Sequence, residues 1–218
     1  MIYKNRIHAG HVLAQKLRHY AKRPDVLVLG LPRGGVPVAY EIAVELHVPM
    51  DVFVVRKLGV PGHRELAMGA IASGGVMVLN KDVLESLAIP EQDLNEVFRE
   101  ELSELLRREQ EFRGAALPLQ LTGRTAILVD DGLATGASMR AAVQAARRLH
   151  PSRLVVAVPV AARSTCASLS READEIICGE TPEHFEGVSQ WYEDFNQTSD
   201  DEVRKLLSLA REKYNNAA

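Results

Sequence analysis

Residues 125–140 read TAILVDDGLATGASMR, and the rest of the chain can be interpreted outward from this stretch. The first five residues form the apolar run typical of a buried parallel strand. Two carboxylates, Asp130 and Asp131, follow directly, and a loop of small residues then leads into an Ala-rich helical pattern over residues 137–149. This order of residues predicts a strand, an acidic pair, a loop of small residues and a helix, one after another along the chain.

The loop after the acidic pair has the features of an anion site. Gly132 and Gly136 let the backbone approach a ligand closely, and free N–H groups at the start of a helix attract negative charge. Thr135 and Ser138 add hydroxyl donors. The carboxylates would repel a bound phosphate, so they suit hydroxyls or a metal-bound group beside it. A phosphate next to a diol is the pattern of ribose 5-phosphate.

This stretch resembles the phosphoribosyl pyrophosphate (PRPP) motif of type I phosphoribosyltransferases, in which aliphatic residues, two acids and an Ala/Thr-Thr-Gly-X-Ser/Thr loop succeed one another. The resemblance implies that Asp130 and Asp131 bind the ribose 2- and 3-hydroxyls and lie near Mg²⁺, directly or through water. It assigns the 5-phosphate to the loop residues Ala134, Thr135, Gly136, Ala137 and Ser138. An ordinary strand-to-helix turn is the alternative, whereas a P-loop would need a Lys here and a dinucleotide fingerprint would need G-x-G-x-x-G.

A second glycine loop, LPRGGVP at residues 31–37, follows the apolar run of residues 25–30 and precedes a helical pattern to about residue 47. Arg33 offers forked donors that match phosphate oxygens. The position resembles the pyrophosphate loop of the same family, and its Arg-Gly-Gly is similar to the xanthine-guanine branch. The resemblance implies a pyrophosphate site made of Pro32, Arg33, Gly34, Gly35, Lys57 and Arg64. It also implies that Asp130, Asp131, Arg33 and Lys57 are the catalytic residues.

Residues 57–65, KLGVPGHRE, are predicted to be a loop after a strand at residues 51–56. The family has a mobile loop here, whose basic residues would neutralise pyrophosphate. We favour this function for Lys57, while a solvated turn without function is an equal alternative for His63 and Arg64. Because parallel strands end at one edge of a sheet, we expect Arg33, Lys57 and the acidic pair to meet there.

Strands and helices alternate along the chain, which predicts an α/β fold with a mostly parallel central sheet and helices on both faces. We expect one phosphoribosyltransferase domain over residues 1–218, and the family resemblance covers about residues 25–180. A β-hairpin is expected at 66–72 and 76–80, and a helical insertion at about 81–113. The tail, about residues 179–214, resembles the family's variable hood. Its aromatic residues Trp191, Tyr192 and Phe195 could pack in the core or stack on a base, and for Trp191 we favour burial in the core or in a dimer interface over stacking.

Composition excludes several classes of protein. A net charge of −3 and a pI near 6.2 give no basic field for nucleic acid, and the apolar runs are too short to span a membrane. Residues 1–6 lack the apolar segment of a secretory signal. Cys166 and Cys178 are interpreted as small buried thiols in a reducing cytosol. We therefore expect a cytoplasmic protein, and a homodimer.

The implied reaction is Mg²⁺-dependent transfer of ribose 5-phosphate from PRPP to a nitrogenous acceptor, with release of pyrophosphate. A nucleobase, and hence nucleotide metabolism, is the favoured context. Some 6-oxopurine enzymes of the family carry an Asp where this chain has Ala134, so the loop provides no acid or base for a purine and the acceptor stays unidentified. A non-catalytic PRPP-sensing regulator and a PRPP-dependent hydrolase are the alternatives.

Overall fold

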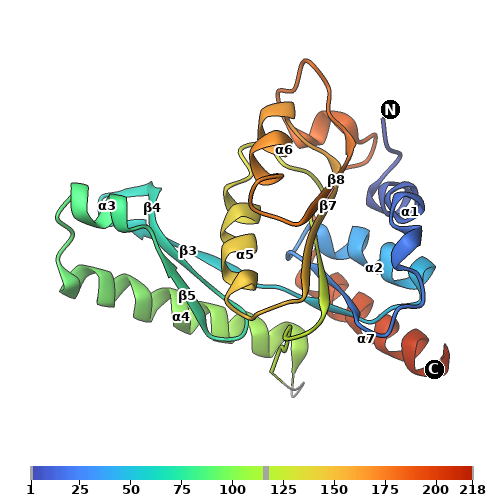
Figure 1. Cartoon of the computed structure of the whole chain (residues 1–218), viewed down its shortest axis with the longest axis horizontal. Helices are drawn as coiled ribbons and strands as arrows, with labels where there is room; N and C mark the ends of the chain where they lie inside the picture. Colours follow the sequence, from blue (N-terminus) through green and yellow to red (C-terminus); the bar gives the residue numbers. More distant parts are fainter. Residues whose placement is uncertain (1, 115–117, 218) are drawn as a thin grey trace.

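The computed structural model describes residues 2–114 and 118–217, apart from the side chains of Arg64, Glu65, Asn216 and Ala217. Figure 1 shows a body of sheet and helices from which an arm extends to one side. In chain order the elements are α1 (Arg6–Lys16), the short 3₁₀ helix η1 (Arg18–Tyr20), β1 (Val26–Gly30), α2 (Gly35–Leu46), β2 (Met50–Val52), β3 (Val55–Val60), β4 (His63–Ala72), β5 (Val76–Leu79), α3 (Lys81–Ser86), α4 (Glu91–Arg113), β6 (Thr125–Val129), α5 (Ala137–Arg147), β7 (Arg153–Val160), α6 (Arg163–Leu169), β8 (Glu175–Glu180), η2 (Val188–Trp191) and α7 (Asp200–Ala217).

The body contains a five-stranded sheet in the order β2-β1-β6-β7-β8, and every neighbouring pair is parallel. β2 lies beside β1 at one side of the sheet, and β7 and β8 follow β6 toward the other side. The direction of winding therefore reverses between β1 and β6, and such a reversal leaves a crevice at the carboxyl ends of the strands. Because Gly30 pairs with Val129, the two central strands end level with each other.

Both faces of this sheet are covered, which explains why its strands are continuous apolar runs. All five residues of β1 and all five of β6 are buried, as expected of a parallel sheet with helices on both sides. Side chains alternate along each strand: Val26 and Val28 join the core that includes α1, α2 and α7. Leu27 and Leu29 join the core that includes α5 and α6. The predicted α/β architecture is confirmed.

The arm consists of the antiparallel sheet β3-β4-β5 with α3 and α4 packed against it (Figure 1). The predicted hairpin and the helices expected over residues 81–113 are confirmed. The predicted loop at residues 57–65 is wrong, because β3 runs to Val60 and β4 begins at His63. Only Pro61 and Gly62 form the turn, with Gly62 at φ +77°. Gly59 lies at a register shift of the strand pair, a place where glycine serves a bulge rather than a loop.

The strand expected at residues 51–56 is also divided differently. β2 ends at Val52 and β3 begins at Val55. Between them, the Phe53 amide donates to the Gly30 carbonyl and Ser73 Oγ accepts from the Val54 amide at 2.9 Å. The chain thus leaves the parallel sheet and enters the arm.

The bonding of the two cysteines differs from the one predicted from the sequence. Cys166 on α6 and Cys178 on β8 form a disulfide, with their Cα atoms 6.8 Å apart. Two isolated cysteines in a sequence carry no sign of this pairing. It arises because the connection from α6 back to β8 places the two elements side by side. The prediction of two free thiols is wrong, and with it the argument for a reducing compartment that rested on them.

The start of the chain meets residues 185–198, whereas the C-terminal helix α7 ends at a different part of the body (Figure 1). Tyr3 forms an isolated parallel bridge with Tyr192, and its hydroxyl donates to the Pro159 carbonyl at 2.9 Å. Tyr192 in turn packs against Phe195, with ring centroids 5.0 Å apart. We call residues 3–6 together with residues 185–198 the hood. Within the described part of the chain, no helix has both the length and the apolar character needed to cross a bilayer.

Candidate active site

The two glycine loops that follow β1 and β6 touch each other. A Cβ added at Gly34 would lie 2.1 Å from Asp131 Oδ2, and one added at Gly35 would lie 2.4 Å from the Val129 carbonyl oxygen. Only glycine permits so close an approach of one backbone to the other. The structure therefore brings Arg33 and its glycines beside the acidic pair, although they lie about a hundred residues apart in the sequence. The peptide bond between Pro32 and Arg33 is cis.

The loop at residues 134–138 is open to solvent at the start of α5. Gly136 precedes the helix at φ +71°, a left-handed conformation that favours glycine. Ala134, Thr135, Ala137 and Ser138 are exposed. The loop is held from behind by Thr165 on α6, whose hydroxyl donates to the Ala134 carbonyl at 2.7 Å. Exposed amides and hydroxyls at a helix N-terminus suit a phosphate.

The acidic pair is partly buried rather than sealed in the core. Asp130 Oδ1 accepts a hydrogen bond from the Asp131 amide at 2.9 Å, and the Asp131 side chain retains 14% of its exposure. Burial raises the pKa of the Asp130 carboxyl, and the neighbouring charge of Asp131 raises that pKa further. Burial also raises the pKa of Asp131, while Arg6 opposes the rise. Two adjacent carboxylates in such surroundings favour a cation or hydroxyl donors beside them.

The hood holds Asp131 in a way that no motif in the sequence indicated. Arg6 Nε donates to Asp131 Oδ2 at 2.8 Å, and another Arg6 nitrogen lies 2.7 Å from the same oxygen. The Tyr192 hydroxyl donates to the backbone carbonyl of Asp131 at 2.6 Å, and Phe195 stacks beneath the Arg6 guanidinium. Tyr192 and Phe195 thus pack in the hood, in line with one of the two interpretations that the sequence left open. Trp191 is half-buried in the same cluster.

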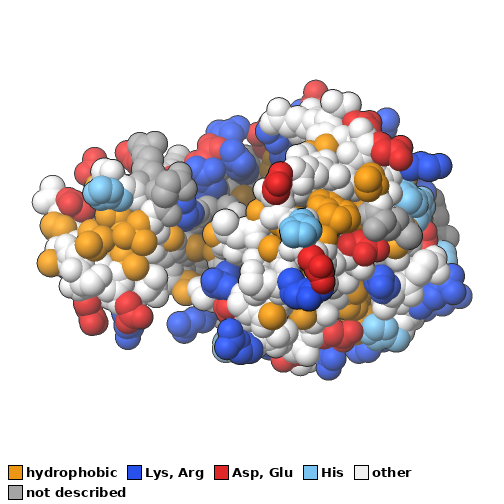
Figure 2. Space-filling model, turned by 90° about the horizontal axis from the view of Figure 1, so that it is seen from above, with side chains coloured by type: hydrophobic (Ala, Val, Ile, Leu, Met, Phe, Trp, Pro, Cys, Tyr) orange, Lys and Arg blue, Asp and Glu red, His pale blue; other side chains and the backbone are white. Residues whose placement is uncertain are grey.

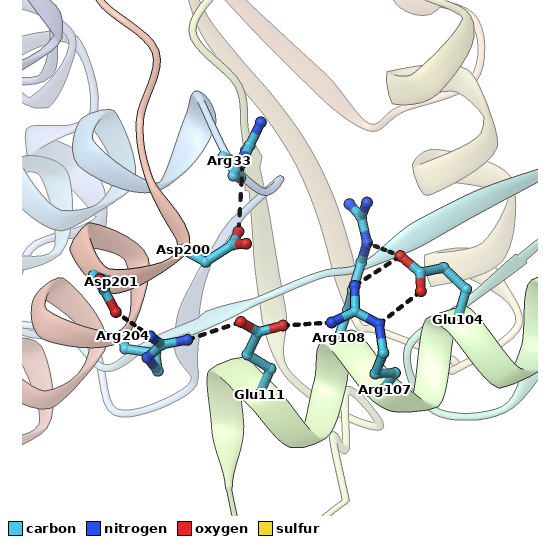
Figure 3. Close-up of polar contacts among 8 residues, drawn as sticks. All are labelled: Arg33, Glu104, Arg107, Arg108, Glu111, Asp200, Asp201 and Arg204. Carbon is cyan, nitrogen blue, oxygen red and sulfur yellow. Dashed lines mark hydrogen bonds and ion pairs between the residues drawn. The ribbon is translucent and has the colours of Figure 1, made fainter.

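Arg33 points toward the first turn of α7, where one of its nitrogens lies 3.7 Å from Asp200 Oδ1. Figure 3 shows a second line of charges, separate from this pair, that joins α7 to the arm. Asp201 pairs with Arg204, and Arg204 pairs with Glu111 of α4. The line then runs along α4 through Arg107, Glu104 and Arg108. The loop that carries Arg33 is therefore joined to α7 by one ion pair, and α7 is joined to α4 by another. Each of these ion pairs is partly exposed and individually weak.

Lys57 lies inside β3, opposite Ala70, and not after a strand of the parallel sheet as expected. It lines a cleft of about 770 Å³ between β3 and α4, and Ser138 lies on the same cleft. Figure 2 shows the hollow between the arm and the body, with Lys and Arg side chains along it. Lys57 thus lies toward the loop at residues 134–138. His63 is exposed at the start of β4, and the side chain of Arg64 lies outside the described residues.

The residues of the acidic pair fit a magnesium ion. Among the side chains that the structure describes, no three His, Cys, Asp or Glu residues gather closely enough to hold a metal by themselves. Mg²⁺ commonly takes one or two carboxylates and completes its shell with water and phosphate oxygens. Asp130 and Asp131 supply that number of hard oxygen donors.

Comparison with known proteins agrees with this geometry. Residues 62–196, more than half of the chain, match the family described as phosphoribosyl transferase domain. The chain belongs to the type I phosphoribosyltransferase family. This match confirms the family predicted from residues 125–140.

Two relatives from Mycobacterium tuberculosis, strains CDC 1551 and H37Rv, are each named "Putative phosphoribosyl transferase" and are 46% identical over 213 residues. The match covers 98% of this chain and 48% of each relative, so the chain spans about half the length of these curated relatives. The crystal structure of TT1426 from Thermus thermophilus is 38% identical, with a TM-score of 0.85, and the match covers 95% of this chain and 98% of that one.

Proposed function

We propose that this phosphoribosyltransferase transfers ribose 5-phosphate from PRPP to a nitrogenous acceptor and releases pyrophosphate, with Mg²⁺ as its cofactor. The observation that carries the proposal is the position of the acidic pair between two glycine loops at level strand ends. A ligand with a monophosphate at one end, a diphosphate at the other and a diol between them matches this order of groups.

Each group of the site has one task in binding. Amides and hydroxyls of residues 134–138 hold the 5-phosphate, and Thr165 fixes the carbonyl at the start of that loop. Asp130 and Asp131 accept hydrogen bonds from the ribose hydroxyls. Arg33 and the amides of Gly34 and Gly35 hold the pyrophosphate, and Lys57 adds positive charge from β3. Bound magnesium would neutralise phosphate oxygens beside the two carboxylates.

The same groups stabilise the charges that develop during transfer. The bond between ribose C1 and the pyrophosphate oxygen breaks, its electron pair leaves with pyrophosphate, and the acceptor nitrogen donates its lone pair to C1. Positive charge on the ribose is stabilised by Asp130 and Asp131, and negative charge on the leaving group by Arg33 and the loop amides. One well-placed donor of this kind contributes about 3–4 kcal/mol to the lowering of a barrier.

The acceptor is proposed only as a nitrogenous molecule, with a nucleobase favoured. Ala134 presents no titratable side chain to it, so the acceptor's proton would leave by another route. A homodimer and a cytoplasmic location also stay predictions.

The test measures pyrophosphate release with PRPP and Mg²⁺ over a panel of nucleobases and small amines, with products identified by mass spectrometry. Asp131→Asn and Arg33→Ala should each reduce turnover by two or more orders of magnitude, because each removes charge stabilisation. Arg153→Ala is the matched control, because Arg153 pairs with Glu175 at the far end of the sheet. Wild-type turnover in either site variant would contradict the assignment.

Two outcomes would replace the proposed reaction. PRPP binding without pyrophosphate release for any acceptor would indicate a sensor, and release without an added acceptor would indicate a hydrolase.

A further inference from the structure

We infer that Arg6 is a positioning residue for the ribose: it holds Asp131 by one carboxylate oxygen and leaves the other to accept a sugar hydroxyl. The inference rests on the proposed function. It concerns a residue that lies 125 positions from Asp131 in the sequence and outside both loop motifs.

The contacts on Asp131 are one-sided. Two nitrogens of Arg6, Nε at 2.8 Å and Nη2 at 2.7 Å, both contact Oδ2. The backbone of Gly34 lies against the same oxygen. Oδ2 is therefore enclosed by the hood on one side and by the pyrophosphate loop on the other. Among the described residues, no hydrogen bond or ion pair to Oδ1 is found, so Oδ1 is the carboxylate oxygen of Asp131 that remains for a ligand.

Arg6 itself is fixed on three sides. Its remaining terminal nitrogen donates to the Asn196 carbonyl at 2.6 Å, and its guanidinium carbon lies 4.0 Å from the centre of the Phe195 ring. Its side chain is 11% exposed. Such a guanidinium loses little freedom when it bonds a carboxylate, so its plane determines where the carboxylate lies.

The charge of Arg6 adds to the strength of this contact. A hydrogen bond between a guanidinium and a carboxylate is stronger than one between neutral groups, and Arg6 lies 2.7 Å from Asp131 Oδ2. Arg6 therefore holds the proposed ribose-binding carboxylate in one orientation before the substrate arrives.

Arg23 provides a matched control elsewhere in the chain. It pairs with Asp25 at 2.7 Å, and its guanidinium lies over the Tyr20 ring at 5.4 Å. The same three components, a guanidinium, a carboxylate and an aromatic ring, are thus present before β1, at the opposite end of the strand from the acidic pair.

The experiment titrates ribose 5-phosphate, inorganic pyrophosphate and PRPP separately into the wild type, Arg6→Met, Arg6→Lys and Arg23→Met, in magnesium buffer, by calorimetry. We expect Arg6→Met to weaken ribose 5-phosphate and PRPP binding by roughly tenfold to a hundredfold, the range for a hydrogen bond to a charged group. Pyrophosphate binding should change less than about threefold. Arg6→Lys should bind ribose 5-phosphate more tightly than Arg6→Met, and Arg23→Met should match the wild type.

Thermal unfolding of each variant checks that it is folded. If Arg6→Met does not fold, Phe195→Leu removes the ring beneath the guanidinium and should still weaken ribose 5-phosphate selectively. Unchanged ribose 5-phosphate affinity in these variants, or an equal loss for pyrophosphate, overturns the inference. Failure of the wild type to bind PRPP and ribose 5-phosphate would instead refute the proposed function, so the two failures are distinguishable.

Discussion

Gly34→Ala tests most directly whether the two loops form one site. The backbone of Gly34 has φ −60° and ψ −33°, values that alanine adopts readily, so the substitution introduces no backbone strain. Its new methyl group would nevertheless lie 2.7 Å from Asp131 Cγ. Carbon atoms in contact are normally about 3.5 Å apart, so the carboxyl group must retreat by roughly 1 Å.

That displacement predicts a loss of function much larger than the loss of stability. Overpacking of this kind costs about 1–3 kcal/mol of folding stability, whereas a shift of about 1 Å at a reacting centre can reduce turnover about a hundredfold. The carboxylate would also move relative to Arg6, so ribose 5-phosphate binding should weaken. The measurements are PRPP-dependent pyrophosphate release, calorimetric titration of ribose 5-phosphate, and thermal unfolding.

Gly187→Ala is the matched control for this substitution. Gly187 is extended, with φ −179°, and an added Cβ would meet nothing within 4 Å. It should behave as the wild type in all three measurements. Full activity in Gly34→Ala would refute the reasoning, because the methyl group could then be accommodated without moving Asp131.

Two further predictions concern the support of the site and the stability of the fold. Thr165→Val keeps the methyl group near Gly136 but removes the hydrogen bond to Ala134. It should lower the free energy of unfolding by about 1 kcal/mol and weaken ribose 5-phosphate binding while sparing pyrophosphate; an unchanged affinity would contradict this role. Asp25 accepts from Arg23 and Thr125, and these contacts lower its pKa to about 2. Because the folded pKa lies below the ordinary value for an Asp carboxyl, this contribution to stability is present above about pH 4. It is lost as the pH falls toward 2, so urea unfolding of Asp25→Asn should depend less on pH than that of the wild type between about pH 5 and pH 2. Equal pH dependence would contradict the assignment.

The parts of the site that are local in sequence could be predicted from it. Asp130, Asp131 and residues 134–138 belong to one strand–loop–helix unit, whose conformation is set by its own glycines and apolar residues. The loop at Arg33 is another such unit. That these two units meet followed from one rule about parallel strands, because β1 and β6 are neighbours in the sheet.

Other parts depend on contacts that no local pattern encodes. Gly59, Pro61 and Gly62 were interpreted as a loop, but cross-strand pairing with β4 overrides that signal, and Lys57 consequently lies within a strand. The approach of Arg6 to Asp131 requires the start of the chain and residues 185–198 to fold onto the body. Arg6 occupies an ordinary position in a helical pattern, and nothing in the sequence distinguishes it from the other arginines.

The ion pair between Arg33 and Asp200 bears on how a diphosphate would enter and leave. At 3.7 Å and partly exposed, the pair is worth about 1 kcal/mol or less. An arriving anion would thus replace a weakly held counterion instead of meeting a bare guanidinium. When the diphosphate leaves, Asp200 would pair with Arg33 again. Such an exchange lowers the affinity for the diphosphate slightly, but the guanidinium always has a counterion. It also favours rapid release of the leaving group.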